Sequence, residues 1–175
     1  MLRRAGLTRE RVLGTAVAIA DDGGLEALSM RRLARALGVE AMSLYNHIAG
    51  KEHLLDGMVD VVFAEIERPS AGGDWKQEIR TRAISTRAAL RRHPWAVGLM
   101  EARARPGQSG LALHEAVLAC LREAGFSGPM AIRAHSIHDA YVYGFALREP
   151  SLSDEEEFLF GLDLILDGLE QRLAR

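Results

Sequence analysis

The sequence has few of the residues that build disulfide-rich, membrane-spanning or β-sheet proteins. It contains one cysteine, Cys120, so no disulfide can form within a single chain, and we expect this side chain to be a small buried hydrophobe. No apolar stretch approaches the ~20 residues that a helix needs to span a bilayer. Arg3 and Arg4 precede no apolar core of a signal peptide. We therefore expect a cytoplasmic protein that has no membrane partner.

Aromatic residues are also scarce, at 6%, and there are 5 prolines among 175 residues. No alternating run of β-branched residues lies between turn signals, so no strand is predicted. Alanine, leucine and arginine are frequent, and all three favour helices. The net charge of −2 divides unevenly, because residues 1–51 carry +3 and the remainder carries −5. A basic N-terminal part indicates a nucleic acid partner for that part alone.

Residues 29–51 predict two short helices joined by a turn. Ser29 is a favourable N-cap, and Gly38 stands where the turn needs a residue that tolerates positive φ. Helical spacing turns the apolar residues of both helices inward. Such a pair is either a helix-turn-helix, whose second helix enters the DNA major groove, or an ordinary helical hairpin inside a bundle. The outer face of the second helix presents Ala41, Met42, Ser43, Tyr45, Asn46 and His47.

The flanks favour the helix-turn-helix, because amphipathic helices are predicted over residues 8–22 and 51–66 on either side of it. The segments LSMRRLA, LGV, SLYNHI and KEHLL occur in this order at fixed offsets. Together they resemble the DNA-binding domain of TetR-family transcriptional repressors. The resemblance implies an all-α fold in which residues 1–68 form a three-helix helix-turn-helix domain. The residues that it implies for contact with double-stranded operator DNA are Ser29, Arg31, Ala41, Met42, Ser43, Tyr45, Asn46, His47 and Lys51.

Residues 69–175 predict a C-terminal helical bundle. Pro69 and the Gly72-Gly73 pair break the chain, and helices are expected over residues 75–92, from Pro94, and over 109–124 and 130–147. A last helix, capped by Ser153 or Asp154, carries residues 158–169. The segments DW, RP, GFS and FLFGLDLI resemble the regulatory domain of tetracycline repressors. This resemblance implies that the second domain binds a ligand and dimerises.

The last predicted helix is apolar on more than one stripe, as expected of a helix that is buried on several sides. We expect it to pair with a second copy of the chain in a homodimer, although a central helix inside one chain would show the same pattern. The residues expected at the dimer interface are Phe158, Gly161, Leu164, Ile165 and Gly168.

A small-molecule effector is implied by the same resemblance, and its identity does not follow from the sequence. Few charged residues fall on the predicted inner faces, so we expect a mainly apolar ligand. Glu101 stands where tetracycline repressors use a histidine to hold the drug with magnesium, which argues against tetracycline itself. The residues expected to line the pocket are Trp95, Leu99, Met100, Glu101, Leu113, Val117, His135, His138 and Tyr141, together with Tyr143.

Three functions remain open at this stage. The first is a DNA-binding transcriptional regulator that its ligand releases from the operator, with no cofactor, no metal and no catalytic residue. The second is a DNA-binding dimer that has no small-molecule effector. The third is a helical-bundle metalloenzyme built on His135, His138 and Asp139, which share one helical face. We favour the first, because no nucleophile elbow or phosphate loop is present. A last expectation is that Arg87, Arg91 and Arg92 form a solvated face.

Overall fold

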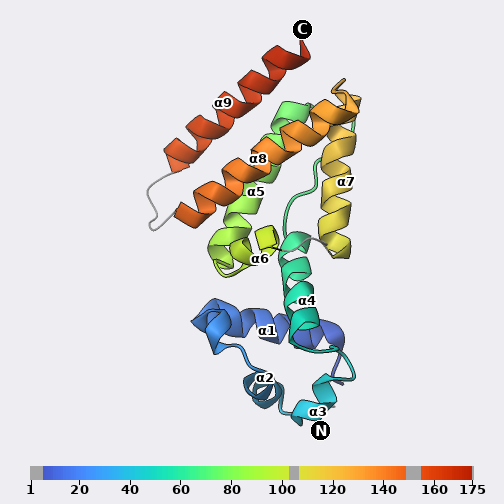
Figure 1. Cartoon of the computed structure of the whole chain (residues 1–175), viewed down its shortest axis with the longest axis vertical. Helices are drawn as coiled ribbons and strands as arrows, with labels where there is room; N and C mark the ends of the chain where they lie inside the picture. The colour runs from blue at the N-terminus through green and yellow to red at the C-terminus, as the bar shows by residue number, and fades with distance from the viewer. Residues whose placement is uncertain (1–5, 103–106, 149–154, 175) are drawn as a thin grey trace.

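The computed structural model describes residues 6–102, 107–148 and 155–174, and over these ranges the chain is helical and contains no strand (Figure 1). The expected all-α fold is confirmed. Across the same ranges, no helix has the length and apolar character needed to cross a membrane. The helices are α1 (Arg9–Gly23), the 3-10 helix η1 (Leu25–Ala27), α2 (Met30–Leu37), α3 (Ala41–Leu44), α4 (Lys51–Ala64), α5 (Trp75–Arg92), α6 (Ala96–Ala102), α7 (Gln108–Glu123), α8 (Gly128–Arg148) and α9 (Glu155–Leu173).

The helix-turn-helix forms as its capping residues predict. Ser29 precedes α2, and its hydroxyl accepts a hydrogen bond of 3.2 Å from the amide of Arg32. Gly38 ends α2 in the left-handed conformation, with φ 69° and ψ 36°, which few residues other than glycine adopt readily. The apolar side chains of Leu33, Leu37 and Leu44 are buried beneath the two helices. Local sequence therefore fixes both the start of α2 and the turn into α3.

The second helix of the motif is shorter than expected, because α3 covers only Ala41–Leu44 and a turn follows. The amide of Tyr45 donates to the carbonyl of Met42, and the amide of His47 donates to that of Leu44, at 3.2 and 2.9 Å. These bonds span three residues instead of four, so the backbone tightens after the first turn. The same tightening ends α4 at Ala64, before the expected residue 66 and before Pro69.

Helix α4 is shared by two hydrophobic cores. Its first half contributes Leu54, Leu55 and Met58 to the core of α1–α3, which we call the head. Its second half contributes Val59 and Val62 to the core of α5–α9, which we call the body. Figure 1 shows α4 rising from the head and entering the body beside α7. A domain division near residue 68 remains a prediction, since the apolar contacts of both parts run along this one helix.

Within the body, α5 forms with the expected bounds. Asp74 caps it by accepting hydrogen bonds from the amides of Lys76 and Gln77, at 3.0 and 3.4 Å. Helix α6 begins at Ala96, so Trp95 precedes it. The expected cap of the last helix, Ser153 or Asp154, lies outside the described residues.

The N-terminus of α7 is capped from another helix. Gly107 supplies no side chain there, and the carboxylate of Asp60 on α4 takes this role. Its Oδ1 accepts from the amides of Ser109 and Gly110, at 2.7 and 3.2 Å, and Oδ2 accepts from the Ser109 hydroxyl at 3.2 Å. Because a carboxylate stabilises the positive end of a helix, this contact holds α7 firmly against α4.

Helix α9 buries one face inside the chain, and this corrects part of the expected dimer interface. Phe158 is 1% exposed and stacks on Tyr141 of α8, with ring centroids 5.7 Å apart. A Cβ at Gly161 would collide with the ring of Tyr141, so this glycine allows α8 and α9 of one chain to approach closely. The prediction that Phe158 and Gly161 face a second copy is therefore wrong. Leu164 and Gly168 lie exposed, and Ile165 is half-buried.

The expectation of a solvated arginine face is also wrong for Arg87. This side chain is 6% exposed, and its guanidinium lies 5.0 Å from the ring centroid of Phe158 and 5.7 Å from that of Phe145. A guanidinium is weakly hydrated and stacks well on aromatic faces, which makes such burial tolerable. Arg91 and Arg92 are exposed as expected.

Candidate functional site

Helices α2 and α3, which carry several of the residues expected to contact DNA, lie at the end of the head farthest from the body (Figure 1). Met42, which lies on α3, is 76% exposed, and Tyr45, which directly follows α3, is 50% exposed. Arg31, Asn46 and Lys51 are exposed as well, while Ala41, Ser43 and His47 are half-buried. The hydroxyl of Ser29 is already engaged as the cap of α2, so this residue serves the motif first as a structural element.

Helix α4 begins next to this surface. Gly50, with φ 133°, precedes it and has no side chain with which to cap its first turn. The first amides of any helix have no helical carbonyl to bond, and together they carry a partial positive charge. Lys51 adds a full charge at the same point. This arrangement suits a phosphate oxygen.

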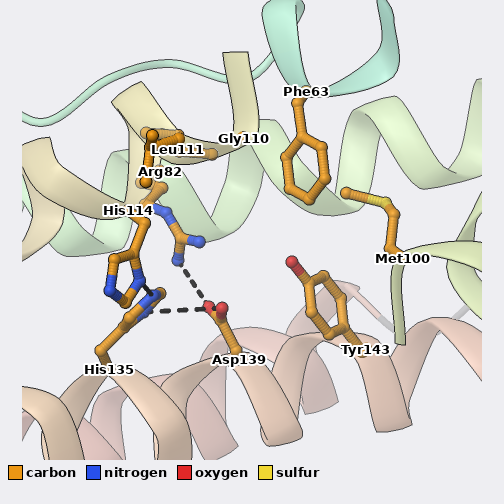
Figure 2. A pocket seen from close by; sticks show the side chains of 10 residues that line it. Phe63, Arg82, Met100, Gly110, Leu111, His114, His135, Asp139 and Tyr143 are labelled. Atoms are coloured by element: carbon orange, nitrogen blue, oxygen red, sulfur yellow. Dashed lines mark hydrogen bonds and ion pairs between the residues drawn. The ribbon is translucent and has the colours of Figure 1, made fainter. Parts of the chain in front are cut away.

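The body contains a cavity of about 450 Å³ that opens to solvent, which Figure 2 shows from close by. Helices α4, α5, α6, α7 and α8 all contribute to its wall, so it lies beside the helix that joins the head to the body. Its volume falls within the range of small-molecule sites. The residues that line it are Phe63, Arg82, Met100, Gly110, Leu111, Leu113, His114, His135, Asp139 and Tyr143.

Met100, Leu113, His135 and Tyr143 were expected at the pocket and line this cavity. The other expected residues whose side chains are described lie elsewhere. Trp95 donates its indole N–H to Asp21 of α1 at 2.7 Å, and Leu99 packs against both cores. Val117 and His138 are buried in the body at 1% and 2% exposure, and the Tyr141 hydroxyl donates to the carbonyl of Phe158 at 2.9 Å. Glu101 lies outside the residues whose side chains are described.

Sequence reasoning missed Arg82, which is 2% exposed and has its guanidinium at the cavity wall (Figure 2). Its Nη1 donates to Asp139 at 2.8 Å and lies 2.9 Å from Nδ1 of His138. A signal for this burial was present, because Arg82 shares the inward stripe of α5 with Ile79, Ala83 and Thr86. Arginine-rich helices usually expose their charges, which hid this signal.

Two histidines continue the polar side of the cavity beyond Asp139. Nε2 of His135 lies 2.8 Å from Nδ1 of His114, and Nδ1 of His135 lies 3.5 Å from Asp139. Burial favours the neutral imidazole and lowers the pKa of His135 to about 4. Burial is the largest influence on Asp139 and opposes its ionisation, but the Arg82 guanidinium, the hydrogen bond with His138 and the neighbouring His135 together outweigh burial and hold the pKa of Asp139 below its ordinary value. At neutral pH the wall thus combines one cation, one anion and a neutral His135.

The three residues on which a metalloenzyme was considered are engaged by protein groups. His138 faces Arg82, and His135 faces His114. Among the described residues, no group of three histidine, cysteine, aspartate or glutamate side chains could hold a metal ion. The guanidinium of Arg82 would also repel a cation at this place. The metalloenzyme reading thereby loses the ligand set on which it depended.

Cys120 lies on α7, the helix that forms one wall of the cavity, but its side chain faces the core. It is 2% exposed, in accord with the expectation of a small buried hydrophobe. Burial, together with nearby carboxylates, raises the pKa of its thiol to about 11. The thiol therefore stays protonated at neutral pH, and a protonated thiol is a poor nucleophile.

A helix-turn-helix head that shares one helix with a cavity-containing helical body defines an architecture found among bacterial regulators. Residues 12–58 match the model for bacterial regulatory proteins of the tetR family, and residues 68–157 match the model for the tetracyclin repressor-like C-terminal domain. The second match covers half of the chain by itself. The chain therefore belongs to the TetR family.

Individual relatives agree with this assignment. The HTH-type transcriptional repressor DrrR1 of Streptomyces coeruleorubidus is 41% identical over 158 residues, which cover 89% of this chain and 58% of that relative. The chain thus spans less than two thirds of its length. The ActR protein of Streptomyces coelicolor in complex with actinorhodin superposes with a TM-score of 0.86 at 27% identity, covering 98% of this chain and 100% of ActR. BioQ bound to its double-stranded DNA operator superposes with a TM-score of 0.78 at 32% identity, covering 94% of this chain and 98% of BioQ.

The neutral state of His135 predicts a measurable loss of stability in mild acid. The pKa of His135 in the folded chain, about 4, lies below the ordinary histidine value of 6.5, so between these values the unfolded chain binds a proton that the folded chain does not. Stability is therefore full above about pH 6.5 and falls toward about pH 4, by at most about 1.4 kcal/mol per pH unit for one proton. Urea unfolding between pH 7.5 and about 4.5 measures this slope.

His135→Gln should reduce that slope, and the lowered pKa of buried His138 should account for a remaining part, while the same change at the exposed His53 should leave the slope as in the parent chain. An unchanged slope in His135→Gln would show that this imidazole does not remain neutral on folding.

Proposed function

We propose that the chain is a dimeric, DNA-binding transcriptional repressor of the cytoplasm, that a small molecule releases it from its operator, and that it catalyses no reaction. The observation that carries this proposal is the cavity bounded by α4, the same helix whose first half packs in the head. BioQ bound to its operator, ActR bound to actinorhodin and the repressor DrrR1 supply the parallel. The direct test is selection of a preferred duplex from a random pool. A chain that enriches no sequence contradicts the proposal.

On DNA, the proposed roles divide by chemistry. Contacts to phosphate position a protein, and contacts to base edges determine the sequence that it recognises. Lys51 and the first amides of α4 suit phosphate, and the hydroxyl of Tyr45 suits it as well. Met42, the most exposed of these side chains, can reach into the major groove, where its apolar end matches a thymine methyl group. Arg31 and Ser43 can serve either role.

The phosphate role of Lys51 predicts a sequence-independent loss of affinity. Lys51→Ala should weaken binding to the selected operator and to random duplex alike, because it removes one phosphate contact. The slope of log affinity against log salt should become shallower by about 1 per head. Fluorescence anisotropy across a salt series measures both quantities.

Arg122→Ala is the matched control, since it removes one exposed positive charge from α7 in the body. A salt slope for Lys51→Ala equal to that of the parent chain would exclude the phosphate contact.

The proposed dimer forms through the outer faces of α8 and α9, which lie side by side in Figure 1. Ile137 of α8 is 53% exposed, and Phe160 and Leu164 of α9 are 67% and 58% exposed. A groove of about 420 Å³ runs between the two helices, and Leu164, Ile165 and Gly168 help to line it. Gly168 has open space beside it, which would allow a partner helix to approach closely. A second copy would cover these apolar side chains in a four-helix interface.

Leu164→Arg should shift the chain from dimer to monomer. The change places a charge without a partner in the proposed interface, and burying such a charge costs several kcal/mol. Light scattering across a dilution series measures the assembly state.

Ile84→Arg provides the control, because Ile84 of α5 is 44% exposed and lies outside the α8–α9 groove. If Leu164→Arg dimerises as well as Ile84→Arg does, the interface lies elsewhere.

Helix α4 is the proposed element that transmits a movement of the cavity wall to the head. Polar contacts fix this helix to its neighbours at two positions. Near the cavity, Asp60 caps α7. At the C-terminal end of α4, Glu65 accepts from Arg92 at 2.7 Å and lies 3.2 Å from Nε2 of His93. Nδ1 of His93 lies 2.7 Å from Asp21 of α1. Movement of the cavity wall would therefore reach the head through bonded contacts and through shared packing.

Asp60→Ala should uncouple the cavity from the head. Energetic coupling between sites is reciprocal, so operator binding should alter amide hydrogen exchange in the first turn of α7 in the parent chain. The alanine variant should bind operator normally and lose this response, because the bond that transmits it is absent. Exchange detected by mass spectrometry, with and without operator, gives the readout.

Asp60→Asn should restore the response, since asparagine caps helices as well as aspartate does. A response that persists in Asp60→Ala would remove Asp60 from the route.

The rival reading, a DNA-binding dimer without an effector, gives no role to the cavity. The combination of an apolar wall with buried polar groups favours an effector.

A further inference from the structure

The cavity has two unlike sides, and this shape carries information about its ligand. Figure 2 shows Phe63, Met100 and Tyr143 on one side and His114, His135 and Asp139 on the other, with Arg82 beside the histidines. Aromatic rings and a thioether favour contact with a flat ring system. A ligand that satisfies both sides must be apolar at one end and polar at the other.

The polar side carries no net charge from its buried groups. The guanidinium of Arg82 and the carboxylate of Asp139 pair at 2.8 Å, and side-chain exposures of 2% and 21% leave little water to screen them. The pKa of His135 and that of His138 are both lowered by burial, so both rings are neutral near pH 7. A carboxylate or ammonium group on the ligand would lose its hydration here and gain no uncompensated partner. The balance of charge thus favours an uncharged polar group.

The hydrogen-bond directions specify that group further. Nδ1 of His135 faces the Asp139 carboxylate at 3.5 Å, so the proton of this neutral ring belongs on Nδ1. Nε2 of His135 must then accept from Nδ1 of His114, 2.8 Å away. That leaves Nε2 of His114 with a lone pair. The series of polar contacts that starts at Arg82 therefore ends at Nε2 of His114, an acceptor to which a ligand hydroxyl can donate.

A second observation indicates that this side of the cavity awaits a partner. Nε of Arg82 is buried and has no hydrogen-bond partner among the described residues. Buried polar atoms are nearly always hydrogen-bonded, so an unpartnered guanidinium nitrogen on a residue of the cavity wall is unusual. Arg82 itself is 2% exposed, and its guanidinium lies against the cavity.

We propose that the cavity binds an uncharged aromatic ring system bearing a phenol-type hydroxyl, with that hydroxyl donating to Nε2 of His114 and the rings lying against Phe63, Met100 and Tyr143. This inference rests on the proposed function, since it names the chemical class of the effector. The chain therefore selects against carboxylated molecules of the same shape. His114 is the residue that reads the hydroxyl, and the ion pair of Arg82 with Asp139 excludes the charge.

Three matched compounds test this proposal by calorimetry on the full chain without DNA: naphthol, naphthalene and naphthoate. Naphthol should bind about tenfold more tightly than naphthalene, because one satisfied hydrogen bond is worth about that factor. Naphthoate should bind more weakly than naphthol by about the same tenfold factor or more. Naphthoate that binds as tightly as naphthol, or no binding by any of the three, would overturn the proposal.

Two variants separate the named groups. His114→Leu changes an exposed side chain and should abolish the preference for naphthol over naphthalene, whereas His53→Leu, also at an exposed position but in the head, should retain it. Asp139→Asn should leave Arg82 uncompensated and turn the preference toward naphthoate. An unchanged preference in His114→Leu would remove this histidine from the site, and an unchanged preference in folded Asp139→Asn would refute the charge argument.

Operator release by naphthol is scored separately, in the anisotropy assay used for DNA. Naphthol that binds as described without releasing operator supports the ligand class and counts against release by a ligand in this cavity. Operator binding that persists while none of the three compounds binds leaves the repressor in place and overturns the ligand class.

Discussion

The packing of α4 constrains every other part of this molecule. One helix supplies Leu54 and Met58 to the core of the head and Val59 and Val62 to the core of the body, with no linker between the two sets. Neither part can therefore rotate without repacking the other. Close-packed interiors resist gradual deformation and change between discrete arrangements, so a small displacement at the cavity can become a larger one at the head. The mechanical link of this protein is a hydrophobic one, which the bonds of Asp60 and Glu65 reinforce.

Buried arginines give the body its second defining property. Arg82 and Arg87 occupy neighbouring turns of α5, and the positive charge of each buried side chain is compensated in a different way. Arg82 is neutralised by a carboxylate, and Arg87 lies over aromatic rings. Ion pairs of this kind add little net stability compared with apolar packing, because desolvation offsets most of the attraction. The Arg82–Asp139 pair lies at the cavity wall, where we infer that it serves recognition, and the naphthoate comparison tests this role.

Sequence reasoning succeeded where local chemistry determines the structure. Ser29, Gly38 and Asp74 each act within a few residues of their own position, and their caps and turn form as expected. It failed where distant contacts decide. Nothing local to Trp95 reveals that Asp21 lies opposite its indole, and nothing local to Phe158 tells whether its apolar face meets α8 of the same chain or of another. Asp60 caps a helix that begins 48 residues later in the chain, a distance at which no sequence pattern operates.

The residues that line the candidate pocket could likewise be predicted from the sequence only in part. Apolar positions such as Met100 and Leu113 could be found from helical spacing, since inward stripes and cavity walls coincide. The polar residues of the pocket lining could not be found in this way, because arginine is usually exposed and an arginine on an inward helical stripe is therefore not expected to be buried. Arg82 reaches Asp139 only because α5 packs against α8. The carboxylate of Asp139 then compensates the charge of the buried guanidinium.

Cys120 gives this chain an experimental convenience. With a thiol pKa of about 11, only about one molecule in ten thousand carries the thiolate at pH 7, and the side chain is 2% exposed. A maleimide dye would therefore ignore the native sequence. A cysteine placed at Met42 would be the one reactive thiol of each chain, and two dyes in a dimer would report the separation of the recognition surfaces by energy transfer, with no native residue to remove beforehand.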